Sequence, residues 1–393
     1  MKAQKKIMIL GGGYYQLPLI KKSVDLGYYT IVCGIKGNYP GYKYADLWLE
    51  VDTFNKEAVL SVAQKYKIDG ILLCGTDACM PTIGYVCDKM HLTGPSEEST
   101  VAASNKAEMK KRFVANGVRT AYYQKIFSVA EAEQFAQQHK YPVVLKVVDA
   151  SGSKGIAIVH NEKELSEEYG LVKRETKLDY IIIEEFVKGE EFGAQAFVRN
   201  GKLTFVMPHG DVTYHGLTNV PVGHYAPYER TNELRNDIME QLALCVKALG
   251  INNTAINADF ILKDDKVYVL EIGARAGATC LPELVSCHYD VDYYEYLLRM
   301  CVGENMSFPQ EPQNASWVET LQTQQNGVVK SIEIPEMPKE VHEFCLYPQV
   351  GDVVRPFRNA YDRIGTLVMK GKNLNELKVL RDRLLEGFKI TTR

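Results

Sequence analysis

Hydrophobic and polar positions in the first hundred residues follow the pattern of strands that alternate with helices. The almost wholly apolar segment Lys6 to Leu10 is typical of a strand buried on both faces. Three glycines and a helix-like stretch to Leu26 follow, and then a strand, Thr30–Cys33. A helix Lys56–Tyr66 leads to a strand Gly70–Cys74. This order predicts an open parallel sheet with right-handed crossovers.

The pattern changes after Thr93-Gly94-Pro95-Ser96, which marks a break. A continuous helix is expected over Ser99–Asn116. Between Tyr141 and Val198 the apolar runs are short and bounded by turns, as in an antiparallel sheet. The remaining expected elements are a helix Asn232–Leu249, a hairpin Thr254–Ile272 and a final helix Leu374–Gly387.

Composition fits a folded soluble protein and excludes several function classes. Of 393 residues, 46% are hydrophobic and 24% charged, which excludes a disordered, collagen-like or membrane-spanning chain. Lysine and arginine number 46 against 49 acids, so no overall charge favours nucleic acid or an anionic membrane. The nine cysteines form no CxxC pair, and the apolar N-terminal stretch breaks at Gly11, too early for a signal peptide. We expect a cytoplasmic protein with reduced thiols.

Two features suggest phosphate binding. Lys146 lies in the apolar segment Pro142 to Val148, where an ammonium group is costly to bury without an anion; alternatively, it lies on an edge strand and reaches water. The segment Ala150 to Ile156 holds two glycines and two serines, whose N–H and hydroxyl groups could cover phosphates. It lacks the Walker A spacing, and a flexible hairpin turn is the alternative.

Acidic residues follow two apolar segments. Tyr180 to Ile183 leads into Glu184 and Glu185, and the chain bends at Gly189 before Glu191. This suits a nucleobase packed on Val187 and a ribose held by Glu191, although acids at strand ends are usually solvated.

The second acidic pair is Asp259 and Glu271, in the two strands of the expected hairpin. An even-numbered loop places Asp259 opposite Leu270 and the acids on opposite faces, whereas an odd-numbered loop pairs them on one face. A shared cation requires the same face, and therefore favours the odd loop. Arg275 follows closely enough to neutralise a transferring phosphoryl group. Two solvated acids on a surface hairpin are the alternative.

A dinucleotide-binding fold is disfavoured. After Gly11-Gly12-Gly13, Gln16 stands where the fingerprint requires glycine, and Cys33 stands where a ribose-binding acid is expected.

The order of a helix lysine, a strand lysine, a glycine-serine loop, an acidic hinge and a carboxylate pair with an arginine resembles the ATP-grasp superfamily. Gly94-Pro95-Ser96 with Asn105-Lys106, Glu184 to Phe192, and Asp259 with Glu271 to Arg275 carry the resemblance. Within it the chain looks most like the carboxylate–amine ligases, which include amino-acid ligases and carbamoyl-phosphate-synthase-like proteins. The resemblance implies an α/β and α+β fold. Its parts are an open parallel α/β domain (1–95), an ATP-grasp domain (96–310, with a small lid subdomain about 117–186) and a C-terminal α+β portion (311–393), with the nucleotide between two α+β subdomains.

The resemblance also implies roles for individual residues. The ATP-binding set is Lys106, Lys146, Gly152, Ser153, Lys154, Gly155, Glu184, Glu185, Val187 and Glu191. The implied magnesium ligands are Asp259 and Glu271, and the implied catalytic residues are Arg275 and Lys146. Many members carry asparagine two residues after the second acid, where this chain has Gly273. Asn257 is a candidate replacement ligand.

The implied reaction uses ATP and magnesium to activate a carboxylate as an acyl phosphate, which an amine then converts to an amide or peptide bond. Substrate contacts are expected from Thr76, Asp77, His209, His215, His224 and Arg275. The expected partners are small-molecule carboxylates and amines, with no nucleic acid or membrane, and a homodimer is an expectation by resemblance. An ATP-grasp carboxylase, a purine-pathway ligase and a non-catalytic ATP-binding regulatory protein remain alternatives.

Overall fold

The computed structural model describes residues 4–150, 155–215, 219–358 and 362–393. Contacts divide the chain into two compact units. The first comprises Met1–Met207, Asn232–Ala278 and Tyr294–Phe308; the second comprises Pro208–Thr231, Thr279–Tyr293 and Pro309–Arg393. The sequence analysis expected contiguous domains with boundaries at 95 and 310. Because each unit is built from three separate segments, the units do not test those boundaries, which remain predictions.

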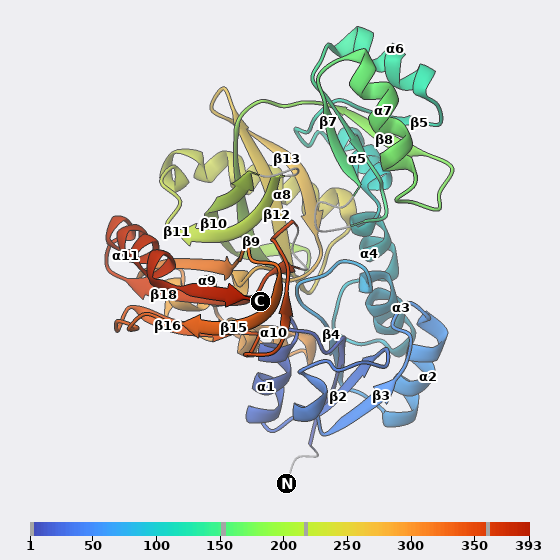
Figure 1. Cartoon of the computed structure of the whole chain (residues 1–393). Coiled ribbons are helices and arrows are strands. Elements are labelled where there is room, and N and C mark those ends of the chain that lie inside the picture. The colour runs from blue at the N-terminus through green and yellow to red at the C-terminus, as the bar shows by residue number, and fades with distance from the viewer. Residues whose placement is uncertain (1–3, 151–154, 216–218, 359–361) are drawn as a thin grey trace. The chain divides into compact units, whose positions relative to one another are not determined.

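A four-stranded parallel sheet begins the first unit, as the sequence predicted (Figure 1). Its strand order is β3-β2-β1-β4, with β1 and β2 at the centre of the sheet. Its elements are β1 (Lys6–Leu10), α1 (Leu17–Asp25), β2 (Tyr29–Gly34), a 3-10 turn (Tyr42–Tyr44), β3 (Leu47–Glu50), α2 (Lys56–Tyr66), β4 (Gly70–Leu72) and α3 (Met80–Met90). The Thr76–Asp77 segment follows β4, at the carboxyl edge where parallel sheets bind ligands.

The prediction of one continuous helix over Ser99–Asn116 is wrong, because the structure has two helices there. Helix α4 (Glu97–Ser104) ends at Asn105, and α5 (Lys106–Ala115) begins immediately after it. Asn105 is extended (φ −119°, ψ 109°), and its side chain accepts a hydrogen bond from the Glu108 backbone N–H. It therefore caps α5 and places Lys106 in the first helical turn rather than in the middle of a helix.

A four-stranded antiparallel sheet follows, with strand order β5-β8-β6-β7. Its elements are β5 (Tyr123–Ile126), α6 (Val129–His139), β6 (Val143–Lys146), β7 (Ile156–Val159), α7 (Glu162–Lys173) and β8 (Ile181–Glu185). The inward faces of β6 and β8 pack with α6 and α7 in one apolar cluster that includes Val143, Leu145, Ile181 and Ile183. Lys146 ends β6 beside this core.

The remaining sheet of the first unit has the order β13-β12-β9-β10. Its elements are β9 (Glu190–Arg199), β10 (Lys202–His215), α8 (Thr231–Leu249), β12 (Thr254–Lys263), β13 (Lys266–Gly273) and α10 (Tyr293–Cys301). The expected helix before the hairpin and the hairpin itself are confirmed within one residue at most boundaries. Strand β10 passes from the first unit into the second after Met207.

The second unit is mostly antiparallel. Its part of the eight-stranded sheet has the order β10-β11-β14-β18-β16, and β17-β15-β19 form a separate three-stranded sheet. Its elements are β11 (Asn219–Ala226), α9 (Leu281–Tyr289), β14 (Ala315–Leu321), β15 (Gly327–Glu333), β16 (Val341–Leu346), β17 (Val353–Val354), β18 (Gly365–Gly371), α11 (Leu374–Gly387) and β19 (Lys389–Thr392). Helix α11 packs Leu377 and Leu384 on a core that includes Trp317 and Leu367. Among the described residues, no helix combines the length and apolarity that crossing a membrane requires.

Candidate active site

Lys106 links the start of α5 to the hairpin of the expected acidic pair. Its Nζ donates to the Glu271 carboxylate (3.0 Å to Oε1) and to the Ala150 carbonyl (2.8 Å). Burial lowers the pKa of Lys106, but the Glu271 carboxylate more than offsets this and leaves the pKa raised. Lys106 therefore carries a positive charge beside one of the two implied metal ligands.

Lys146 belongs to a buried ion cluster with Glu184. Its Nζ lies 2.9 Å from the Glu184 Oε2, and the same oxygen lies 3.4 Å from the Nζ of Lys110. Burial raises the pKa of Glu184, but the two ammonium groups outweigh burial and hold it below its usual range. The Glu184 side chain is 2% exposed, so it anchors two lysines rather than presenting a free carboxylate.

Asp259 and Glu271 lie directly opposite each other on β12 and β13. The connecting loop has two residues, Asp264 and Asp265, both with positive φ as in a type I′ turn. The odd loop on which the sequence argument relied is therefore absent. A bulge at Leu270 supplies the extra residue instead: Phe260 pairs with Val269, and Asp259 with Glu271. The two acids thus lie on one face.

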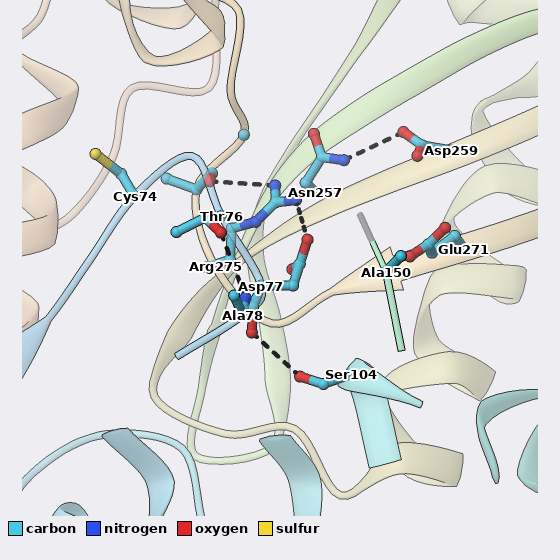
Figure 2. Close-up of polar contacts among 12 residues, drawn as sticks. Cys74, Thr76, Asp77, Ala78, Ser104, Ala150, Asn257, Asp259, Glu271 and Arg275 are labelled. Carbon is cyan, nitrogen blue, oxygen red and sulfur yellow. Dashed lines mark hydrogen bonds and ion pairs between the residues drawn. The ribbon is translucent and has the colours of Figure 1, made fainter. Parts of the chain in front are cut away.

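Asn257 lies on the same face of β12, two residues before Asp259, as Figure 2 shows. Its Nδ2 donates to the Asp259 Oδ1 at 3.1 Å, and its Oδ1 accepts from the buried Gln195 Nε2 at 2.6 Å. The amide therefore orients Asp259, while its own oxygen is held by Gln195. This favours a supporting role for Asn257, and its expected role as a direct metal ligand stays a prediction.

Arg275 and Asp77 form a mostly buried ion pair, with their side chains pointing toward each other (Figure 2). The Nη2–Oδ2 distance is 2.5 Å. Burial lowers the pKa of Arg275, but Asp77, with smaller contributions from Asp259 and Glu271, raises it. The Arg275 Nε and the Asp77 Oδ1 are both buried without a hydrogen-bond partner among the described residues. Each therefore has unused capacity to bind a polar ligand.

Gly273 has a local reason to lack a side chain. A Cβ built there lies 2.7 Å from the Asp77 Oδ1 and 3.2 Å from the Arg275 Cζ. Contacts under about 3.0 Å require something to move. The Asp77–Arg275 pair therefore occupies the space into which an asparagine at position 273 would project.

The expected adenine-side residues divide into two groups. Val187 is 4% exposed and packs with Ile261 and the partly buried bulge residue Leu270, which gives an apolar surface next to the acidic pair. Glu185 accepts a hydrogen bond from the Tyr122 backbone N–H at 3.2 Å. Glu191, the expected ribose ligand, is exposed near the start of β9.

Some expected residues lie elsewhere or outside the described part of the chain. Gly152, Ser153 and Lys154 are outside it, and Gly155 alone of that loop is described, with φ +67°. His209 and His224 are both in the second unit, where each faces Asp211; the side chain of His215 is outside the described residues. Thr76, Asp77 and Arg275 belong to the first unit.

Lys110 was missed by the sequence argument. It is 1% exposed and shares Glu184 with Lys146. The sequence did hold a signal for Lys110: it lies four residues after Lys106, and therefore on the same face of a helix. Gln195, which donates to the Asn257 side chain, was also missed and had no comparable sequence signal.

Comparison with known proteins agrees with this geometry. Residues 103–279 match the ATP-grasp domain family, and residues 320–393 match the family described as L-amino acid ligase C-terminal domain 2. A crystal structure of phosphoribosylglycinamide synthetase from Anaerococcus prevotii is 33% identical, with a TM-score of 0.84 over 99% of this chain and 100% of that one.

Two further similarities are more distant. The L-amino acid ligase of Bacillus licheniformis has the same fold, with a TM-score of 0.85 over the whole of both chains and 19% identity. The formate-dependent phosphoribosylglycinamide formyltransferase of Prochlorococcus marinus (strain NATL1A) is 25% identical over 308 residues, which cover 76% of this chain and 77% of that protein. The predicted fold class is confirmed. The chain belongs to the ATP-grasp superfamily, and it is an ATP-dependent ligase of the kind that forms carbon–nitrogen bonds.

Proposed function

We propose that this protein uses ATP and Mg²⁺ to join the carboxylate of an amino acid to an amine, with ADP and phosphate as the other products. The observation that carries the proposal is the pairing of Asp259 with Glu271 on one sheet face, with the Lys106 ammonium bonded to Glu271. Two carboxylates and an ammonium at one place suit a magnesium-bound triphosphate.

The donor set fits magnesium. Asp259 and Glu271 offer the carboxylate oxygens that Mg²⁺ prefers, and Mg²⁺ commonly takes one or two protein carboxylates together with substrate phosphates. When bound there, Mg²⁺ supplies positive charge against the phosphate oxygens. Lys106 and Lys146 are the two candidate ammonium groups for the phosphates, and each would exchange its carboxylate partner in part for phosphate oxygen.

The proposed chemistry needs no nucleophile from the protein. A carboxylate oxygen of the substrate attacks the γ-phosphorus, and ADP leaves. The amine nitrogen then attacks the acyl carbon, phosphate leaves with that carboxylate oxygen, and the nitrogen loses a proton. Arg275 holds the reacting carboxylate, while Lys106 and Lys146 hold phosphates, so that positioning and charge neutralisation account for the rate.

An amino acid is favoured as the carboxylate substrate by Asp77 and Arg275 together. Within the part of the chain that the structure describes, the Arg275 Nε is a buried donor without a partner, and the Asp77 Oδ1 is a buried acceptor without one. A molecule with a carboxylate and an ammonium group can use both. The match of residues 320–393 to the L-amino acid ligase C-terminal domain points to the same class.

A second candidate differs in the amine. The 33% identity to the Anaerococcus prevotii protein over essentially the whole chain favours glycine as the carboxylate and a phosphoribosylamine as the amine. That reaction also uses an amino-acid carboxylate, so the two candidates share the activation step and differ in the second substrate.

The test is a screen of the purified protein for Mg²⁺-dependent ADP release with amino acids, each alone and in pairs, and with glycine plus phosphoribosylamine. Mass spectrometry identifies the amide. The proposal expects one class of pair to release ADP and amide in equal amounts, and Glu271→Gln to abolish both. Asp264→Asn, which removes an exposed carboxylate from the turn of the same hairpin, is the matched control and keeps the activity. ADP release that is independent of any carboxylate, or unchanged in Glu271→Gln, contradicts the proposal.

A further inference from the structure

We propose that His209, Asp211 and His224 bind one divalent transition-metal ion, Zn²⁺ or a metal of similar ligand preference, in the second unit. Its ligands differ in kind from the Asp259–Glu271 pair: two imidazole nitrogens and one carboxylate oxygen rather than oxygens alone. Imidazole selects zinc and related transition metals over magnesium.

The three side chains share one face of a β-hairpin because of strand periodicity. His209 and Asp211 are two residues apart on β10, so they point to the same side. His224 lies directly opposite Asp211 on β11. A His-x-Asp segment with a histidine at the cross-strand position therefore brings three ligand atoms together without any special loop. The bulge in this pair lies beyond them, between Val212 and Thr213.

The ligand atoms converge on a small space. The Asp211 Oδ1 lies 3.0 Å from the His209 Nδ1 and 2.6 Å from the His224 Nδ1, and the three atoms all lie within 4.8 Å of one another. With metal–ligand bonds of about 2.0–2.1 Å, two ligands at the tetrahedral angle are about 3.3 Å apart. Metal binding therefore requires both contacts of Asp211 to open, that with His209 by roughly 0.3 Å and that with His224 by roughly 0.7 Å.

The cluster is buried and holds a carboxylate without a lysine or arginine. His209 is 1% and His224 4% exposed. In the described part of the chain, the ion-pair partners of Asp211 are the two imidazoles. A buried carboxylate is stabilised by a cation, and an imidazole supplies one only when it is protonated. A metal ion at the point where the three atoms converge supplies that charge.

The orientation of His209 is consistent with binding through Nδ1. It contacts Asp211 through Nδ1, and its buried Nε2 has no hydrogen-bond partner among residues 4–150, 155–215, 219–358 and 362–393. Metal binding at Nδ1 replaces the hydrogen bond to Asp211 and places the ring proton on Nε2; we take the cost of that unpaired N–H to be smaller than the stabilisation from the metal–ligand bonds. The ion would tie β10 to β11 and stiffen this hairpin.

The test uses full-length protein without a histidine tag, stripped of metal by chelation and then freed of chelator. Co²⁺ is titrated by its visible absorption, in the presence of excess Mg²⁺ and ADP to occupy the ATP site. The proposal predicts one Co²⁺ per chain, displaced by one Zn²⁺, and a higher melting temperature with Zn²⁺. X-ray absorption of the zinc-loaded wild-type chain should report two imidazole ligands, which does not depend on whether any variant folds.

Variants then assign the site. His209→Gln, Asp211→Asn and His224→Gln should each lower the Co²⁺ affinity by more than about 100-fold. His342→Gln, an exposed histidine of the same unit, is the control and should bind as wild type. The absence of stoichiometric binding to the wild-type chain, or equal binding by His224→Gln, would overturn the proposal: Asp211 then only accepts hydrogen bonds from the two imidazoles.

Discussion

Asp77 and Arg275 are 198 residues apart in the chain, yet they form an ion pair of 2.5 Å that lies against Gly273. This pair connects the loop after β4 of the parallel sheet to the end of β13, which carries Glu271. It also accounts for a departure from the family pattern, because the space that an asparagine needs at position 273 is taken by the Asp77 carboxylate.

Restoring the family asparagine should therefore be harmful rather than helpful. Gly273→Asn brings the new Cβ within 2.7 Å of the Asp77 Oδ1, so we expect loss of the Asp77–Arg275 geometry and a destabilisation of about 1–3 kcal/mol. Denaturant unfolding measures the effect. A gain in stability or in apparent magnesium affinity by the single variant would contradict this account.

The double variant Gly273→Asn/Asp77→Ser tests the same contact by shortening the side chain at position 77. Since the shorter serine leaves room at position 273, the double variant should be more stable than the sum of the two single changes predicts. A double-mutant cycle should give a coupling of about 1 kcal/mol or more. Additive effects would mean that the two positions do not compete for space.

Much of the fold could be predicted from the sequence, because the hydrophobic pattern determines which residues are buried. The expected helices Lys56–Tyr66 and Leu374–Gly387 and the strand Lys6–Leu10 have the predicted bounds. The break between α4 and α5 was not predicted, since Asn105 can cap a new helix or sit within a longer one, and its backbone conformation decides.

The site was predictable in its residue types but not in its pairings. The sequence identified Asp259 and Glu271 and required an odd loop to bring them together, whereas the structure uses a two-residue turn and a bulge at Leu270. Parity arguments cannot locate a bulge, because one extra residue at any position in the strand has the same effect on register. Long-range contacts such as Asp77–Arg275 leave no local pattern at all.

Glu184 should be the most important member of its ion cluster for stability. Glu184→Gln leaves Lys110 and Lys146 buried without a carboxylate, and we expect a destabilisation of about 3–5 kcal/mol. Lys110→Met should destabilise the protein less, because Glu184 still forms its ion pair with Lys146. Chemical denaturation of the three proteins measures this order, and equal effects of the two substitutions would contradict it.

The same carboxylate predicts a pH dependence of stability. The folded-state pKa of Glu184 lies below its unfolded value, so its stabilising contribution is complete above the unfolded pKa of about 4.3 and is lost as the pH falls through the folded value. The free energy of unfolding should therefore fall in acid, and fall less steeply in Glu184→Gln. Parallel pH profiles of the two proteins would argue against a perturbed Glu184.

Arg275 should act through its guanidinium shape as well as its charge. Arg275→Lys keeps a positive charge but loses the fixed fork that faces Asp77 and, in the proposed mechanism, holds the reacting carboxylate, so we expect kcat to fall by about 100-fold. Arg275→Met should lower it further. Steady-state kinetics with a saturating substrate pair measures both, and a lysine variant with normal kcat would remove Arg275 from the proposed chemistry.

The central claim is that the Asp259–Glu271 pair and its lysines serve transfer of the γ-phosphoryl group to a carboxylate. The most direct measurement supplies the amino-acid substrate with ¹⁸O in its carboxylate and follows the label by mass spectrometry of the phosphate released. This account predicts one ¹⁸O in each phosphate formed together with amide, and no labelled phosphate from Glu271→Gln. Amide formation with unlabelled phosphate would contradict it.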